Sequence, residues 1–353
     1  MTGVRPTFDP VPVPGSAGTT DGASLLIEVL AWAESPPLRW LCDRFGVEMP
    51  TTPLLSGAER LGRLAAAASE VWDFRGAGAG RLERNQVDLA SSAEAGTEAL
   101  VTDAARALGL VDPRPPRRRR YDALVILGGL VRGNAWRSAY AAHLLATETI
   151  SADRVVALTA DRPLAPNPAD PSRDEFVLLE RLGFEKAALE SDAMEQALTR
   201  SFPLPSFRRV APAGPSGWEE GAAVRESQAN GGPPVRLVVA PPDAPTGRRA
   251  DTAATLRFWL RAVDPLERGS HILIVTSCIY VPYQSLVALR EVALPFGLGV
   301  ETIGVDISVV DTSAAPNEFR AVHYLQELLS SIRAAAEIAR ELEERAPSHG
   351  PES

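Results

Sequence analysis

Two acidic side chains, Asp161 and Glu175, are the strongest candidates for acid–base chemistry in the sequence. Asp161 follows the apolar segment 154–159, and Glu175 opens a helical pattern soon after it. A carboxyl group that is partly buried can have a pKa near neutrality, which suits it to accept and donate protons. If the protein is an enzyme, we therefore expect Asp161 or Glu175 to be its catalytic group.

Candidate ligand-binding residues also follow apolar segments. Gly128 and Gly129 have no β-carbon, so backbone N–H groups at the start of the next helix could approach an anion; a tight turn is the alternative. Arg132 and Arg137 could hold the anionic group. The candidate ligand contacts are Gly128, Gly129, Arg132, Asn134, Arg137, Thr159, Asp243, Arg248, Asp251, Thr252, Thr276, Ser277 and Tyr280. For Asp251-Thr252 and Thr276-Ser277, capping of the following helix is the alternative.

The sequence gives little support to several other kinds of functional site. Lys186 is the only lysine, so 35 of the 36 basic residues are arginine, and neither a GxxxxGK[ST] loop nor a GxGxxG fingerprint is present. Cys278 has no histidine at a neighbouring strand end, which favours a packed small residue over a nucleophile. No HExxH pattern predicts zinc, and the need for a divalent ion stays open.

The elements that would position these residues follow from hydrophobic patterning. Continuous apolar segments predict buried strands at 121–127, 154–159, 235–240, 271–276 and 299–305, and helical patterns lie between them. This alternation predicts an α/β fold with a Rossmann-like, open, mostly parallel five-stranded sheet. In such sheets ligands bind beyond the carboxyl ends of the strands, which is where the candidate residues lie.

The predicted organisation along the chain has five parts. They are a disordered N-terminus (1–20), a helical domain (21–111), a Pro/Arg linker (112–120), the α/β domain (121–345, with an insertion at 203–234) and a disordered tail (346–353). A long amphipathic helix is expected over 317–344. The arginine run in the linker is interpreted as a solvated connector, with a phosphate-facing role as the alternative. The loop 72–85 and the insertion could each contact ligand or merely anchor and space the domains.

Composition limits the classes of partner that the protein is expected to bind. A net charge of −9 and a pI of about 5.2 argue against a nucleic-acid or anionic-membrane binder. Two cysteines cannot form a disulfide scaffold, and no run of about 18 apolar residues or signal peptide is seen. We expect a cytoplasmic protein with a small-molecule ligand; its oligomeric state stays open.

Several short motifs in 121–306 resemble the YdcF-like domain family, the fold shared with SanA and ElyC. The segment 124–129 with Arg137 looks like the family's first strand and helix, and the acidic helix that starts near Glu175 fits its second. Asp251-Thr252 stands where the family has an Asn-Thr pair, and 274–282 looks like its last strand. The resemblance implies a ligand cleft for S-adenosylmethionine or a related nucleotide, and the soluble branch of the family.

Two classes of function therefore compete. The first is a cytoplasmic enzyme that carries out group transfer or hydrolysis on a small anionic or nucleotide-like ligand. The second is a non-catalytic protein that binds a nucleotide or S-adenosylmethionine and has a regulatory role. An envelope-biogenesis factor like the anchored relatives of the YdcF-like family is a third interpretation.

Overall fold

The computed structural model describes residues 6–16, 18, 21–50, 52, 54–76, 95–168, 170–212, 219–242, 247–315 and 319–345. The chain divides into two compact units. The first comprises Met1–Asp112, Ile279–Arg290 and Phe319–Ser353, and the second comprises Pro113–Cys278 and Glu291–Glu318. Expectations about Asp243, the loop from residue 77 to 85 and the tail 346–353 fall outside the described residues.

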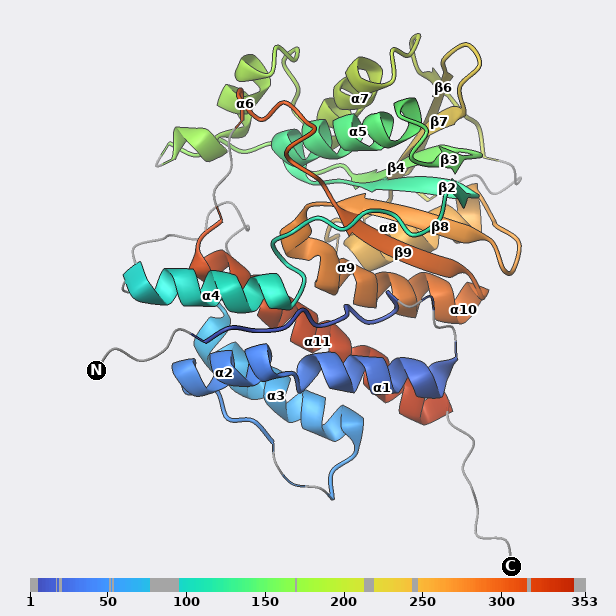
Figure 1. Cartoon of the computed structure of the whole chain (residues 1–353). Coiled ribbons are helices and arrows are strands. Elements are labelled where there is room, and N and C mark those ends of the chain that lie inside the picture. Colours follow the sequence, from blue (N-terminus) through green and yellow to red (C-terminus); the bar gives the residue numbers. More distant parts are fainter. Residues whose placement is uncertain are drawn as a thin grey trace, which may run out of the picture. The chain divides into compact units, whose positions relative to one another are not determined.

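The second unit contains a mixed sheet of seven strands in the order β5-β6-β7-β4-β2-β8-β9 (Figure 1). The five strands expected from sequence are present and pair in parallel: β2 (Ala123–Leu127), β4 (Val155–Ala160), β7 (Pro234–Ala240), β8 (His271–Thr276) and β9 (Gly299–Gly304). Every residue of β2 and β4 is buried, as in parallel strands that are covered on both faces.

The expectation of a five-stranded sheet was wrong, because the insertion at 203–234 supplies two more strands. They are β5 (Arg208–Arg209) and β6 (Ala223–Gln228), which join the edge at β7 in antiparallel pairs. β6 is largely polar and only partly buried, so it lacks the continuous apolar run that marks the other strands. A separate small sheet pairs β1 (Arg120–Tyr121) with β3 (Ser151–Ala152).

Helices cover both faces of the seven-stranded sheet (Figure 1). α5 (Leu130–Ala146) and α7 (Glu190–Ser201) pack against each other and against one face, whereas α8 (Thr252–Phe258) contacts β4 and β7 on the other face. The remaining helical segments of this unit are η3 (Pro171–Arg173), α6 (Glu175–Arg181), a π-helical turn at Trp259–Val263 and α10 (Leu294–Phe296). Apolar side chains of α5 and α7, among them Tyr140 and Met194, form the main core with β2 and β4.

A row of alternating charges crosses the sheet near the amino ends of β4 and β7. Glu226 of β6 lies opposite both Arg208 of β5 and Arg236 of β7, and it pairs with them at 2.5 and 2.6 Å. Asp264 continues the row, with Arg236 at 3.1 Å and Arg154 at 2.5 Å. We call Arg208, Glu226, Arg236, Asp264 and Arg154 the charge ladder.

The first unit is helical, as expected from the N-terminal patterning. Its helices are α1 (Gly22–Ala33), α2 (Pro36–Phe45), α3 (Gly57–Trp72), α4 (Ala95–Ala107), α9 (Val281–Ala288) and α11 (Ala321–Arg345). Ser56 caps α3 as the sequence suggests, in a capping box with Glu59. The long C-terminal helix is present as α11, which packs against α1, α3, α4 and α9.

Two short segments lie where the two units meet in the sequence: η5 (Cys278–Tyr280) and a π-helical turn at Leu289–Ala293. Among the residues that the structure describes, no helix combines the length and the apolar character needed to cross a membrane.

Candidate functional site

The first turn of α5 follows β2 directly and lies at the carboxyl end of that strand. Three successive backbone amides there have partners from the chain itself. The N–H of Gly129 donates to Asn134 Oδ1 at 2.8 Å, that of Leu130 to Glu190 Oε1 at 3.2 Å, and that of Val131 to Glu175 Oε2 at 2.9 Å. The amides that sequence reasoning assigned to an anionic ligand are therefore bound by two carboxylates and a carboxamide of the protein.

The two carboxylates come from the starts of two other helices. Glu175 is the first residue of α6 and Glu190 is the first residue of α7. Asp174 caps α6 by accepting from the amides of Phe176 and Val177, so Glu175 is free to point at α5. Negative side chains are stabilised near helix N-termini, and here three such termini surround two carboxylates.

Glu175 is the most unusual titratable group of this region. It is 3% exposed, and burial raises the pKa of its carboxyl to about 7, against the lowering effects of the Val131 amide, Arg162 and Arg132. The nearby carboxylate of Glu190 raises it further. Within the described part of the chain, Glu175 Oε1 has no hydrogen-bond partner. Near pH 7 this carboxyl is present in both protonation states, so it can accept or donate a proton.

Glu190 is held on the other side by Arg162. The Nε atom of Arg162 lies 3.1 Å from Glu190 Oε2, and the backbone N–H of Glu190 donates to the carbonyl of Arg162 at 2.8 Å. A β-carbon at Gly128 would lie 2.6 Å from Glu190 Oε1. The glycine at 128 is therefore required by the close approach of a protein carboxylate.

Arg137 is buried and ties two strand ends together. Its guanidinium donates to the carbonyls of Leu127 at 2.7 Å and Gly128 at 2.6 Å, and to the hydroxyl of Ser277 at 3.2 Å. Gly129 makes room for it, because a β-carbon at Gly129 would lie 2.7 Å from Arg137 Cζ. We call Asn134, Arg137, Arg162, Glu175 and Glu190 the α5 cluster.

Other expected residues lie beside the α5 cluster. Arg132 donates to the carbonyl of Ser172, and Asp161 is exposed and accepts from the hydroxyl of Ser191, the residue after Glu190. Thr159 is buried, and its hydroxyl donates to the carbonyl of Ala160. Thr276 is fully buried, and its hydroxyl has no partner among the described residues.

The remaining expected contacts are not members of the α5 cluster. Asp251 caps α8 by accepting from Ala254 N–H at 2.9 Å, and Thr252 is the first residue of that helix, so the capping alternative describes them. Arg248 is exposed, Tyr280 belongs to the first unit, and Asp243 lies outside the described residues.

Sequence reasoning missed Glu190 and Arg162. Arg162 follows Asp161 after β4, so the rule that selects strand ends could have included it. Glu190 follows no strand, and its only signal is an acidic residue that opens a helical pattern.

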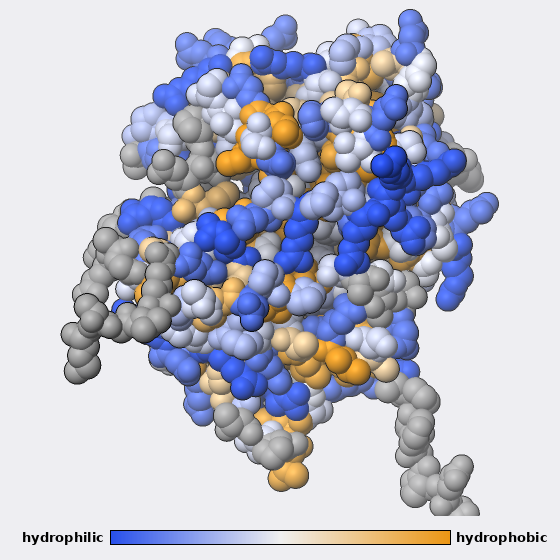
Figure 2. Space-filling model, in the orientation of Figure 1, coloured by the Kyte–Doolittle hydropathy of each residue, from blue (hydrophilic) through white to orange (hydrophobic). Residues whose placement is uncertain are grey.

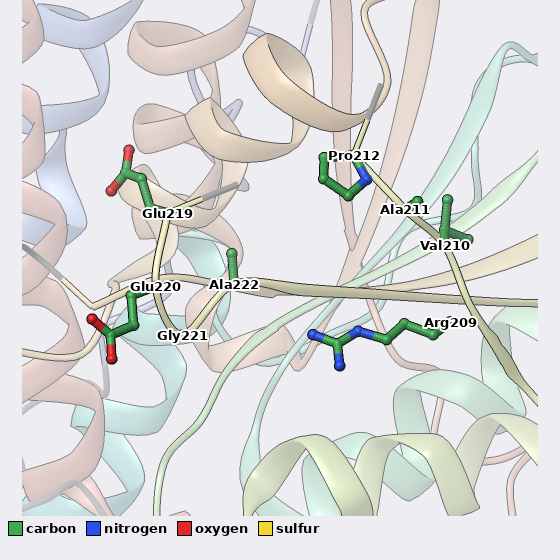
Figure 3. A pocket seen from close by; sticks show the side chains of 8 residues that line it. All are labelled: Arg209, Val210, Ala211, Pro212, Glu219, Glu220, Gly221 and Ala222. Carbon is green, nitrogen blue, oxygen red and sulfur yellow. The ribbon is translucent and has the colours of Figure 1, made fainter. Parts of the chain in front are cut away.

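A hollow of about 620 Å³ lies away from all of these residues, at the ends of β5 and β6. Figure 3 shows the Arg209 side chain extending toward Gly221 and Ala222, while the carboxylates of Glu219 and Glu220 point away from it. It is lined by Arg209, Val210, Ala211, Pro212, Glu219, Glu220, Gly221 and Ala222. None of the residues expected to bind ligand lines it, so we do not count it as part of the candidate site.

Comparison with known proteins finds similarity to mycobacterial sequences over most of the chain. Residues 16–109 match the family model described as the Rv3785 N-terminal domain. The chain is 28% identical over 355 residues to "Uncharacterized protein Rv3785" of Mycobacterium tuberculosis and to "Uncharacterized protein Mb3814" of Mycobacterium bovis, covering 94% of this chain and 94% of each relative. No solved structure matches.

The resemblance to the YdcF-like family is therefore wrong. The family model that matches is that of the Rv3785 N-terminal domain, and the relatives that align along the chain are Rv3785-like proteins. The motifs misled because a strand that ends in glycine before a helix is common in parallel sheets. In this protein Gly128 and Gly129 make room for the side chains of Glu190 and Arg137.

Proposed function

We propose that the protein is a cytoplasmic enzyme that carries out group transfer or hydrolysis on a small anionic or nucleotide-like ligand, with Glu175 as its acid–base group. The observation that carries this proposal is the buried carboxyl of Glu175, whose pKa is raised to about 7, at the carboxyl end of β2. Strongly perturbed carboxyls are concentrated at functional sites, and a pKa near the working pH is optimal for proton transfer.

The surroundings of Glu175 support this role. One oxygen is fixed by the Val131 amide, which orients the carboxyl and leaves Oε1 for the proton. Arg162 and Arg132 act on it electrostatically, so they would stabilise the carboxylate after it has released a proton and would attract an anionic ligand. The parallel part of the sheet, taken as a Rossmann-like arrangement, supports ligand binding at this edge.

A non-catalytic ligand-binding protein is the second candidate, and a specific observation favours it. The three amides at the start of α5 and the guanidinium of Arg137 all have protein partners. An anion could reach the amides of Leu130 and Val131 only by displacing Glu190 or Glu175. In this interpretation the α5 cluster holds three helices together, and ligand is recognised by residues around it.

The test begins with native mass spectrometry of freshly purified protein, which looks for a bound small molecule. A thermal-shift panel of nucleoside phosphates, S-adenosylmethionine and divalent ions then selects a ligand. Glu175→Gln is compared with Glu180→Gln, which changes an exposed carboxyl on the same helix.

If Glu175 is the acid–base group, Glu175→Gln lowers turnover of the selected ligand by about 10²–10⁴-fold and retains its thermal shift, and Glu180→Gln does neither. Recovery of the ligand unchanged after incubation with the wild-type protein would contradict the enzyme proposal and favour the binding protein. Full turnover by Glu175→Gln would remove Glu175 from the mechanism.

A further inference from the structure

The arginine run before β1 is a fixed part of the second unit. The N–H of Arg117 donates to Glu301 Oε1 at 2.9 Å, that of Arg118 to the hydroxyl of Tyr121 at 3.1 Å, and the carbonyl of Arg119 accepts from Ser151 N–H at 2.7 Å. All three side chains belong to exposed residues. The expected loosely solvated connector is thus a backbone attached to β3 and β9, from which three guanidinium groups project.

These three guanidinium groups have no carboxylate partner within the described part of the chain, unlike Arg120, which pairs with Asp153 at 3.2 Å. The other carboxylates close by are already bound: Glu301 by Arg117 N–H and the Tyr121 hydroxyl, and Asp122 by the N–H of His271 at 2.7 Å. Figure 2 shows strongly hydrophilic side chains gathered around the position that β3 has in Figure 1.

Like charges lie close together in this region. Burial lowers the pKa of the Arg114 guanidinium, and the charge of Arg117 lowers it further. Burial also lowers the pKa of His271, with Arg118 adding to the effect and Asp122 opposing it. Arg117 and Arg118 therefore create a positive potential at this end of the sheet, which would attract an anion.

We propose that Arg117, Arg118 and Arg119 form a binding surface for a multivalent phosphate anion at the amino ends of the strands. Guanidinium groups bind phosphate oxygens in a planar, bidentate manner, and three adjacent ones can engage more than one phosphate group. A compact anion fits better than an extended acidic surface, because the chain carries a net charge of −9 and only nearby charges act within a Debye length of about 8 Å.

This surface is separate from the α5 cluster. Arg117–Arg119 precede β2, whereas the α5 cluster follows it, so the two lie at opposite ends of a strand that is roughly 17 Å long. The proposal does not depend on the acid–base role of Glu175.

The experiment is isothermal titration of the full chain with inorganic tripolyphosphate at two salt concentrations. The triple variant Arg117→Gln/Arg118→Gln/Arg119→Gln is compared with Arg63→Gln/Arg181→Gln/Arg261→Gln, which removes three exposed arginines elsewhere and gives the same net charge. We expect at least tenfold weaker binding for the first variant, less than twofold for the second, and weaker binding at higher salt.

Two results would overturn the proposal: no binding by the wild-type protein at low salt, or equal weakening in both triple variants, which would mean that only net charge matters. Co-sedimentation with phosphatidylglycerol vesicles tests the source of the phosphate. Vesicle binding without tripolyphosphate binding would assign the surface to a lipid headgroup and contradict a free anion. Melting curves of both variants should match that of the wild type, because the substituted side chains are exposed.

Discussion

The α5 cluster and the charge ladder belong to the same unit, but they differ in how far they stabilise the charged form of a buried carboxyl. In the ladder each carboxylate lies between two arginines: Glu226 between Arg208 and Arg236, and Asp264 between Arg236 and Arg154. Burial lowers the pKa of Arg236, but the hydrogen bond that Arg236 donates to Glu226 and the charge of Asp264 outweigh it and raise the pKa. In the α5 cluster, Glu175 has a single amide donor, and burial raises the pKa of its carboxyl, so the charged form is disfavoured.

This difference indicates which of the two regions can take part in proton transfer. The ladder is redundant, since each of its carboxylates keeps one arginine when the other is removed, and its charges hold strands in register. The α5 cluster is less redundant, because each bound oxygen has one partner: Glu175 Oε2 has the Val131 amide, and the two oxygens of Glu190 have the Leu130 amide and Arg162. A carboxyl that is held in place but not stabilised in its charged form can exchange a proton. Of these two regions, only the α5 cluster contains such a group, which is Glu175.

The largest expected effect comes from removing Arg137. Arg137→Met leaves the carbonyls of Leu127 and Gly128 and the hydroxyl of Ser277 without their buried donor. Loss of a buried network of this kind costs about 3–5 kcal/mol. Urea unfolding followed by circular dichroism should show a lower midpoint with an unchanged slope.

The matched variant in the charge ladder is Arg208→Met. The Arg208 side chain is 74% exposed and Glu226 retains Arg236, so we expect a loss within about 0.5 kcal/mol. Equal losses from Arg137→Met and Arg208→Met would show that the two regions do not differ in redundancy.

The second effect is the contribution of the Glu175 carboxyl to the pH dependence of stability. Its carboxyl has a pKa of about 7 in the folded protein, against a reference value of 4.5. Between these values the folded state binds more protons than the unfolded state, so the free energy of unfolding falls as the pH rises from about 4.5 to 7. The full difference corresponds to at most about 3 kcal/mol and persists above pH 7.

Glu175→Gln removes this titration while keeping an oxygen for the Val131 amide. The variant should therefore gain stability relative to wild type between pH 5 and pH 8, as measured by urea midpoints across that range. Glu180→Gln, on the exposed side of α6, should follow the wild-type profile. Parallel profiles for wild type and Glu175→Gln would mean that Glu175 has an ordinary pKa, which would weaken the contrast with the ladder.

The sequence predicts the parallel strands well because their signal is local. β2, β4, β7 and β8 are largely apolar runs, and burial on both faces of a sheet requires that composition. β5 and β6 were missed because neither contains an apolar run: β5 is two exposed arginines, and only Val224 and Ser227 of β6 are buried. Their composition is close to that of a loop.

The α5 cluster could be predicted only in part. The residues that follow β2, and Glu175 on the next acidic helix, could be predicted as site residues because ligands bind at strand ends. The partners of those positions depend on folding: Glu190 is 60 residues from Leu130, whose amide it binds. Asp161 and Glu175 look equivalent as acidic residues, yet one is exposed and the other is buried, because only packing decides which carboxyl lies beneath α5.

The smallest expected effect concerns Gly129, which is the N-cap residue of α5, and Gly133, which lies inside that helix. A β-carbon at Gly129 would lie 2.7 Å from the Arg137 guanidinium, which is fixed by two carbonyls and cannot move without losing them. Gly129→Ala should therefore cost about 1–3 kcal/mol. At Gly133 the nearest atom would be 3.6 Å away, an ordinary contact, so Gly133→Ala should stabilise the helix by about 0.5–1 kcal/mol.

The two alanine variants test the packing of Arg137 without removing any polar group. Urea unfolding of both, beside wild type, should give midpoints on opposite sides of the wild-type value. A stabilising Gly129→Ala would show that Arg137 can shift without losing its acceptors. The α5 cluster would then be as tolerant of change as the charge ladder, and the proposed acid–base site would lack the rigid frame that fixes Glu175 against α5.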